Sequence, residues 1–130
     1  MVTSTSEKAP YRTTVTDGTS FLSADTTVEH GGQGGAFRPH DLLCAALASC
    51  LNMTVRMILE RRGLAYETVR VQVDLDRSDP IAPVFRYDME ITGDIDPRIK
   101  QEILRKAANC PVHKTLAQPL SFQAMAPKTH

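Results

Sequence analysis

Three cysteines are the residues of this sequence with the widest choice of chemistry. Cys44 and Cys50 lie six residues apart in RPHDLLCAALASCLNMT, and Cys110 stands directly before a proline in NCPVHKTL. A cysteine can fill a core, bind a metal, form a disulfide or attack an electrophile as its thiolate. The N-terminus shows no basic and apolar export signal, so an extracellular disulfide framework is disfavoured. We expect a cytoplasmic protein whose thiols are reduced, redox-active or metal-bound.

The length and charge of the chain limit the other classes of function. Its 130 residues suit a single domain over positions 1–130, with enough sequence to bury a core. Basic and acidic residues balance at 15 each, which removes the positive charge on which nonspecific nucleic-acid binding depends. The apolar run over 42–59 is interrupted by polar side chains, so we expect a soluble helix there. We therefore predict no nucleic-acid partner and no membrane partner.

A long helix over 39–62 is the best-defined element. Pro39 suits the first helical position, and Gly63 can take the left-handed conformation that ends a helix. Between 42 and 51 the apolar side chains run almost all round the helix, which is typical of a helix enclosed by other elements. We therefore expect Cys50 to be buried at mid-helix.

The remaining segments carry strand and helix patterns. Apolar and polar residues alternate over 69–75 and 85–91, and DRSDPIAP joins the two runs into a hairpin. Asp96 as N-cap opens a second helix, and a short helix runs from Cys110 to about residue 116. The inner side of the second helix carries Ile99, Ile103, Leu104 and Ala107. LSFQAMA predicts a last strand, and YRTTVTDG with SFLSADTTVEH predicts two or three short strands before GGQGG.

Local context separates the three thiols only in part. Cys44, on an apolar helix face, is expected to be a small core residue without reactivity. Cys110, at a helix N-terminus, has unpaired N–H groups and the helix dipole beside it, which favour the reactive thiolate. Cys50 has no such help, so packing is its expected role unless a nearby cation activates it. These patterns leave open which thiol, if any, is a nucleophile.

Three segments together carry a resemblance to a known family. They are RPHDLLCAALASCLNMT, then PVFRYDMEITG in the hairpin, and NCPVHKTL, whose cysteine lies about sixty residues after Cys50. With these segments, and with its order of elements from about residue 10, the sequence resembles a divergent, OsmC-like member of the OsmC/Ohr thiol peroxidases. The resemblance implies an α+β fold and a swapped homodimer. In that dimer, strands from both chains wrap two central helices, with an active site at each end of the interface.

The resemblance also implies a paired-thiol reaction that reduces organic hydroperoxides or hydrogen peroxide in oxidative stress defence. Cys50 matches the peroxidatic cysteine, which becomes a sulfenic acid, and Cys110 matches the resolving cysteine, which condenses with it into a disulfide. An external dithiol, of the dihydrolipoyl type in this family, reopens the disulfide. No cofactor and no metal are implied. First attack by Cys50 opposes the dipole argument, which favours Cys110.

The residues that activate the family's thiolate differ in this sequence. Well-characterised members have a glutamate ten residues before the peroxidatic cysteine, and it orients an arginine. His40 occupies that position here, with Asp41 beside it. The usual arginine of the N-terminal strands has no match, because VTDGTS contains none. Arg38, His40 and Arg12 are therefore the candidates for activating Cys50.

Two other functions are compatible with the residues. His40, Cys50, Cys110 and His113 carry nitrogen and sulfur atoms of the kind that zinc binds. Only CPVH has close ligand spacing, however, and no paired CxxC occurs, so a metal-binding protein is the weaker alternative. The other is a noncatalytic dimer that binds a small hydrophobic molecule in its interface cavity.

Overall fold

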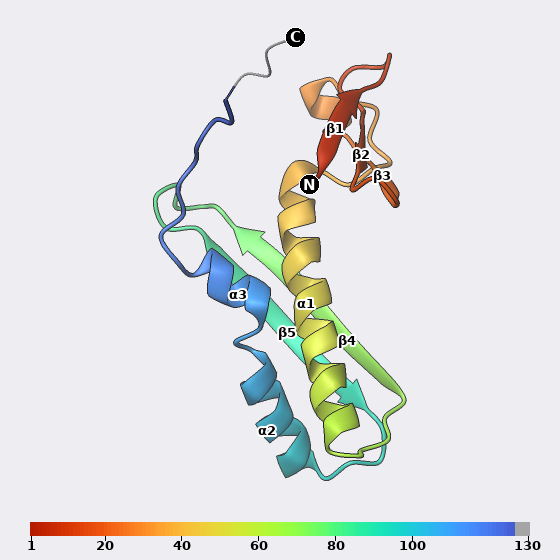
Figure 1. Ribbon diagram of the computed structural model, residues 1–130, viewed down its shortest axis with the longest axis vertical. Helices are drawn as coiled ribbons and strands as arrows, with labels where there is room; N and C mark the ends of the chain where they lie inside the picture. The colour runs from red at the N-terminus through yellow and green to blue at the C-terminus, as the bar shows by residue number, and fades with distance from the viewer. Residues whose placement is uncertain (127–130) are drawn as a thin grey trace. The chain divides into compact units, whose positions relative to one another are not determined.

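The computed structural model describes residues 1–126, and its elements follow the predicted order as far as the third helix (Figure 1). Helices and strands occur together in an α+β chain, as expected. In order, the elements are β1 (Thr3–Ser6), β2 (Thr13–Thr16), β3 (Phe21–Ala24), the 3-10 helix η1 (Val28–His30), α1 (Pro39–Arg61), β4 (Thr68–Asp76), β5 (Val84–Thr92), α2 (Pro97–Ala107) and α3 (Pro111–Leu116).

The contacts within the chain divide it into two units. Unit 1 comprises residues 1–48 and 72–88, and unit 2 comprises residues 49–71 and the chain from 89 onward. Helix α1 and the two-stranded β4–β5 sheet contribute residues to both units. The expectation of a single domain over 1–130 stays a prediction.

Unit 1 contains the antiparallel sheet β1-β2-β3, in which β2 and β3 lie in the two segments predicted to form short strands, whereas β1 lies before them. The loop after β3 is organised by Asp25, whose side chain is buried. Its carboxylate accepts hydrogen bonds from the backbone N–H groups of Thr26 at 2.7 Å, Gln33 at 2.9 Å and Tyr11 at 3.3 Å. Gly32 lies against this network, and a Cβ there would collide with the carbonyl oxygen of Thr26. The glycine-rich loop is therefore an ordered structure built around one carboxylate.

Unit 2 has a hydrophobic core formed by α1, β5 and α2. Val55 and Leu59 from α1 pack in one buried cluster with Ile91 from β5 and with Ile103 and Ala107 from α2. Figure 1 shows α2 beside the C-terminal part of α1. The predicted inner side of α2 is confirmed, because its four members are either buried or packed against this cluster.

The local signals at the ends of the helices are also confirmed. Gly63, with φ of 65°, takes the left-handed conformation after α1, and the Leu64 N–H donates to the Leu59 carbonyl at 3.0 Å. Asp96 caps α2, because its carboxylate accepts a hydrogen bond of 2.8 Å from the Arg98 N–H. These ends need no distant contact, since each is set by residues within the adjoining turn.

One side of α1 is buried and another is exposed, which differs from the enclosed helix that the sequence predicts. The buried side carries Leu47, Leu51, Val55 and Leu59. The exposed side, called the α1 stripe below, consists of Leu43, Ala46, Cys50, Met53 and Met57; its larger members Leu43, Met53 and Met57 are 43%, 53% and 52% exposed, and Cys50 is partly exposed. The prediction of an enclosed α1 with a buried Cys50 is wrong for a single chain, because the described elements cover one side only.

The length and composition of α1 would also suit a membrane span. Its most apolar 18-residue stretch has a mean hydropathy of 1.8, and 22% of that stretch is buried. Core helices of soluble proteins have these properties too. The expectation that the chain has no membrane partner stays a prediction.

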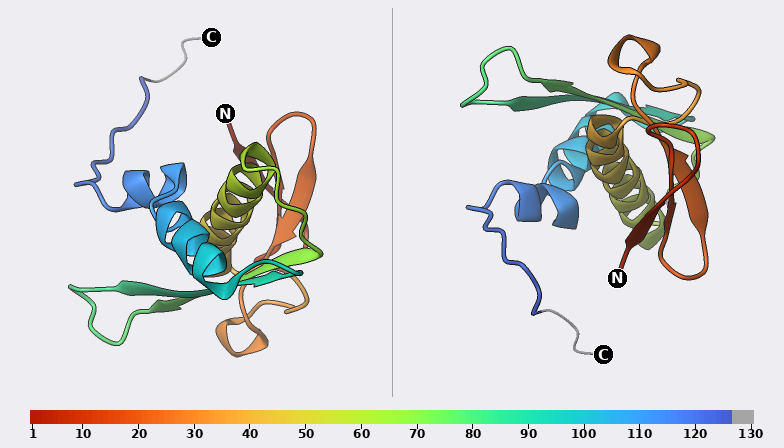
Figure 2. Two further views of the ribbon diagram at one scale, coloured as in Figure 1. Left: turned by 90° about the horizontal axis from the view of Figure 1, so that it is seen from below. Right: turned by 90° about the horizontal axis from the view of Figure 1, so that it is seen from above.

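The predicted last strand, LSFQAMA, does not form in the single chain. This segment, residues 120–126, is extended and exposed, and Figures 1 and 2 show it running away from the end of α3. Its apolar side chains include Phe122, which is 96% exposed. A strand needs a neighbour to pair with its N–H and C=O groups, and no strand within residues 1–126 pairs with this segment. The prediction is therefore wrong for the chain on its own.

Asp25→Asn should destabilise unit 1, because an amide N–H₂ would then face one of the backbone donors that now surround the carboxylate. The N–H of Gln33 is the largest of the causes that lower the pKa of Asp25. A lowered carboxyl pKa stabilises the fold at pH values above the ordinary pKa of about 3.9, and this contribution is lost as pH falls through the lowered value. We expect a melting temperature several degrees lower at neutral pH, with the difference shrinking below about pH 4. Asp88→Asn, at an exposed position of β5, is the control; an equal effect there would contradict the assignment.

Candidate active site

The structure brings together the two cysteines that the resemblance pairs. The backbone N–H of Val112, in the first turn of α3, donates to the Cys50 Sγ over 3.5 Å, although the two residues are 62 positions apart. The next N–H, that of His113, donates to the Cys110 Sγ, also over 3.5 Å. The Cys50 side chain is among the groups that raise the pKa of Cys110. Both cysteines belong to unit 2, and both are free thiols.

The start of α3 explains this arrangement. Cys110 is the N-cap, with an extended backbone at φ −68° and ψ 165°, and Pro111 is the first helical residue. A helix leaves its first N–H groups without intrahelical partners, and side-chain atoms of the N-cap commonly accept from them. Here a sulfur atom takes that role from the usual oxygen. The Cys50 sulfur, which comes from α1, accepts from the adjacent N–H group.

The two thiols differ in exposure, and burial affects the ionisation of Cys110. Cys110 is 1% exposed, whereas Cys50 is partly exposed on the α1 stripe. Burial is the largest cause that raises the pKa of Cys110; the hydrogen bond and charge of Cys50 raise it further, and the N–H groups of His113 and Val112 oppose the shift. The prediction that the helix start favours the Cys110 thiolate is wrong, because burial outweighs the N–H donors.

His113 anchors the turn that carries Cys110. Its imidazole Nδ1 lies 2.6 Å from the carbonyl oxygen of Ala108, the residue that caps α2. The sequence pointed to His113 only as a metal ligand and missed this contact. Its position three residues after an N-cap cysteine is the only signal that places it near the thiols.

Cys44 belongs to unit 1, where it lines a cavity of about 530 Å³. The lining also includes Arg38, His40, Asp41, Asp74 and Arg77, with apolar atoms from Phe37, Val73 and Leu75. Burial, then the carboxylates of Asp41 and Asp74, raise the pKa of Cys44. The thiol form of Cys44 is therefore favoured at neutral pH.

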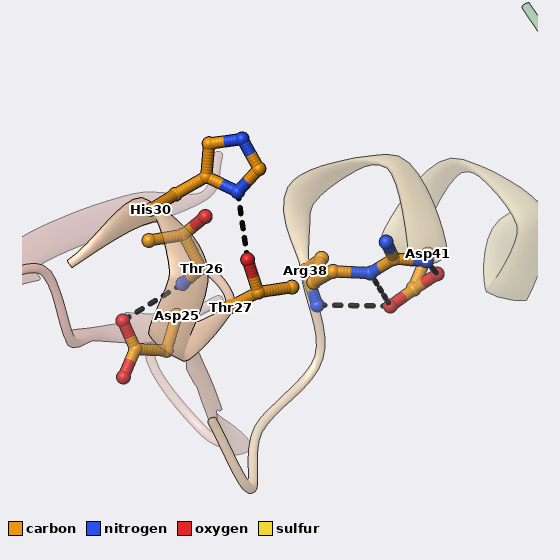
Figure 3. A network of polar contacts seen from close by, with 6 residues as sticks. All are labelled: Asp25, Thr26, Thr27, His30, Arg38 and Asp41. Carbon is orange, nitrogen blue, oxygen red and sulfur yellow. Dashed lines mark hydrogen bonds and ion pairs between the residues drawn. The ribbon is translucent and has the colours of Figure 1, made fainter. Parts of the chain in front are cut away.

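The three residues predicted to activate Cys50 are also found in unit 1. Arg38 forms a two-pronged ion pair with Asp41, with Nε and an Nη each 3.0 Å from a carboxylate oxygen (Figure 3). His40 lines the same cavity as Cys44. The Nε atom of Arg12 lies 3.6 Å from Oε2 of Glu7. Cys50 and Cys110 belong to unit 2.

The rim of this cavity is shaped by a second small network. The Thr27 hydroxyl lies 2.7 Å from Nδ1 of His30, in the turn of η1 (Figure 3).

Across residues 1–126, no three His, Cys, Asp or Glu side chains are grouped as a bound metal ion requires. The alternative set of His40, Cys50, Cys110 and His113 is thus not assembled as one site.

A family model described as OsmC-like protein matches residues 32–124, which is most of the chain. The chain belongs to the OsmC-like protein family. The match spans α1, the hairpin and α3, and so includes both cysteines of the pair. The comparison with curated proteins found no match to this chain.

Solved structures share the OsmC-like fold at low sequence identity. An OsmC-like protein from Mycoplasma pneumoniae has a TM-score of 0.75 at 19% identity, over 89% of this chain and 85% of the other. The organic hydroperoxide resistance protein OsmC from Legionella pneumophila has a TM-score of 0.65 at 22% identity, over 90% of this chain and 88% of the other. OhrB of Bacillus subtilis, another organic hydroperoxide resistance protein, has a TM-score of 0.62 at 19% identity, over 90% of this chain and 89% of the other. The α+β, OsmC-like fold is therefore confirmed.

The raised pKa of Cys110 predicts how its alkylation depends on pH. Maleimides react with the thiolate, so labelling of Cys110 should have its pH midpoint above the value of about 8.5 for an ordinary cysteine. Cys50→Ala removes a hydrogen bond and a charge that raise this pKa, and should lower the midpoint. Cys44→Ala is the control and should leave it unchanged. Labelling is quantified by mass spectrometry of the Cys110 peptide; a midpoint below that of the denatured protein would contradict the role given to burial.

Proposed function

We propose that this OsmC-like protein is a thiol peroxidase that reduces organic hydroperoxides or hydrogen peroxide through Cys50 and Cys110. The observation that supports the proposal most is the pairing of the two sulfurs at the start of α3, with one thiol partly exposed and the other buried. A partly exposed thiol can meet a peroxide, and a buried neighbour can then close a disulfide with it. The names of the Legionella and Bacillus proteins, which concern organic hydroperoxide resistance, agree with this activity.

The proposed reaction has two steps on the protein. The Cys50 thiolate attacks the O–O bond, takes one oxygen as a sulfenic acid, and releases the other as an alkoxide or hydroxide that gains a proton. The Cys110 thiol then attacks the Cys50 sulfur; the S–S bond forms, the S–O bond breaks, and water leaves with the thiol proton. An external dithiol of the dihydrolipoyl type reduces the disulfide and restores both thiols. We assign this cycle to oxidative stress defence in the cytoplasm.

The residue that activates Cys50 is part of the proposal. Arg38 is our first candidate, because Asp41 holds its guanidinium in the oriented, two-pronged geometry that a fixed positive charge requires. His40, in the position of the family's glutamate, and Arg12, beside Glu7, are the other candidates.

We also propose the swapped homodimer. The α1 stripe has members spaced three and four residues apart, which is the spacing of a helix seam that packs against a second helix. Residues 120–126 form an exposed, apolar, extended segment of the kind that adds to the sheet edge of another chain. A second copy of the chain would cover both surfaces, and it would also enclose α1 as the sequence predicts.

The cavity of unit 1 favours one other function. Its volume of about 530 Å³ is in the range of small-molecule sites, and a noncatalytic dimer could use it for binding. Thiol titration before and after one equivalent of tert-butyl hydroperoxide distinguishes the two functions. Loss of two thiols supports the peroxidase, and no loss supports the binder.

The three cysteines should respond differently to substitution. Cys50→Ser should reduce peroxide consumption to the uncatalysed background, whereas Cys44→Ser should retain most of the activity. Cys110→Ser should consume about one equivalent of peroxide and stop, because the sulfenic acid has no partner, and dimedone should trap it. Peroxide loss is followed with a dithiol reductant, and the adducts by mass spectrometry. Turnover by Cys50→Ser would refute the assignment of Cys50.

The homodimer should dissociate when the α1 stripe is made charged. Light scattering should give the mass of two chains for the unchanged protein, and Met53→Lys should shift it toward one chain or to aggregates, because a lysine head group cannot be buried without a partner. Gln101→Lys, at an exposed position of α2, is the control and should remain dimeric. A folded monomer of the unchanged protein at micromolar concentration would contradict the proposed architecture.

A further inference from the structure

His113 makes contacts on both sides of the turn that carries Cys110. Its backbone N–H donates to the Cys110 Sγ over 3.5 Å, and its imidazole Nδ1 lies 2.6 Å from the Ala108 carbonyl oxygen. A carbonyl oxygen only accepts hydrogen bonds, so Nδ1 carries the proton and donates. This donor is present in both the neutral and the protonated imidazole. One residue thus ties the end of α2 to the first turn of α3.

The chain changes direction sharply between these two helices. Ala108 is still helical, at φ −55° and ψ −30°, whereas Cys110 is extended, at φ −68° and ψ 165°. Asn109 is the single residue between Ala108 and Cys110, so small changes in its backbone torsions would change the position of the Cys110 side chain. The carbonyls at a helix end have no intrahelical partner, and the imidazole supplies one at this point. The side chain of His113 therefore restrains the turn that connects the end of α2 to Cys110.

We propose that His113 is a positioning residue, which holds the Cys110 thiol where it can form a disulfide with Cys50. A disulfide requires Cα atoms within about 7 Å and a narrow range of torsions, so the turn must be held closely. Val112, the neighbour of His113, donates its N–H to the Cys50 Sγ. A shift of this turn would therefore disturb the contacts of both sulfurs. His113 acts through the backbone and supplies no proton to the reaction.

The step concerned is the attack of the Cys110 thiol on the sulfenic acid of Cys50. The S–S bond forms, the S–O bond breaks, and the hydroxyl group leaves as water with the proton of the Cys110 thiol. For this step the inference rests on the proposed function. The pairing of the two thiols is a separate property, which glutathione can report without any peroxide.

Two substitutions of similar reach separate the hydrogen bond from the ring. Asparagine places an N–H donor as many bonds from the backbone as Nδ1 of histidine, and leucine places a methyl group there. In glutathione buffers of fixed ratio, alkylation and mass spectrometry give the equilibrium constant for the Cys50–Cys110 disulfide. His113→Leu should lower this constant by about tenfold or more, since closure depends on the alignment of the two thiols. His113→Asn should restore it to near the original value, and Lys114→Leu, at the exposed neighbouring position, should leave it unchanged.

Each other outcome overturns the proposal. An unchanged constant in His113→Leu would show that the hydrogen bond does not position the thiol. A constant as low in His113→Asn as in His113→Leu would assign the effect to the ring, and a protein that forms no such disulfide in glutathione would show that the thiols are not positioned. If His113→Leu fails to fold by circular dichroism, His113→Gln replaces it, because its donor lies one carbon farther from the backbone.

A single-turnover measurement with one equivalent of tert-butyl hydroperoxide separates this inference from the proposed function. His113→Leu should still consume one equivalent of peroxide, because it keeps the Cys50 thiol, but it should form the disulfide more slowly, so that dimedone traps more sulfenic acid. If the unchanged protein consumes no peroxide while the glutathione constants follow the expected order, the proposed function fails and the positioning role stands. If peroxide is consumed and His113→Leu closes its disulfide at the original rate, the positioning role fails alone.

Discussion

Two hydrogen bonds at the start of α3 determine how the thiols of this protein meet. The helix leaves the N–H groups of Val112 and His113 without intrahelical acceptors, and the sulfurs of Cys50 and Cys110 accept from them. One sulfur comes from the cap of the same helix, and the other comes from α1. The bonds that complete the helix start therefore also bring together two residues that lie far apart in the sequence. A change that weakens the helix start would loosen the thiol pair at the same time.

The same turn shows how burial and backbone donors compete at a cysteine. The N–H groups lower the pKa of Cys110, but its burial raises the pKa by more. A protonated Cys110 is a weak nucleophile, so in the proposed reaction it leaves the first attack on a peroxide to Cys50. The partly exposed Cys50 suits the first step, because a peroxide can reach it. The distribution of exposure between the two thiols thus matches the order of reaction better than a helix-dipole argument alone.

A structural feature could be predicted from the sequence when the contacts that produce it lie within one turn of the chain. Pro39, Gly63 and Asp96 set helix ends through contacts within one turn, and those ends were predictable. The pairing of Cys50 with Cys110 came from the family resemblance, because no pattern spans 62 residues of separation. Burial of Cys110 comes from packing between distant segments, so its raised pKa could not be predicted from helix-end chemistry. The contact of His113 with Ala108 depends on the torsions of a two-residue turn, which the letters CPVH do not specify.

The two predictions that failed for the single chain, an enclosed α1 and a strand over 120–126, have a common physical cause. Each describes a surface whose sequence is apolar but whose neighbours are missing from residues 1–126 of one chain. A lipid bilayer could cover an apolar helix, but it offers no hydrogen bonds to the backbone of an extended segment. A second copy of the chain can cover both. Because Cys50 lies in the middle of the α1 stripe, that copy would also set how much of its thiol a peroxide can reach. In the proposed dimer, assembly and reactivity therefore depend on the same face of α1.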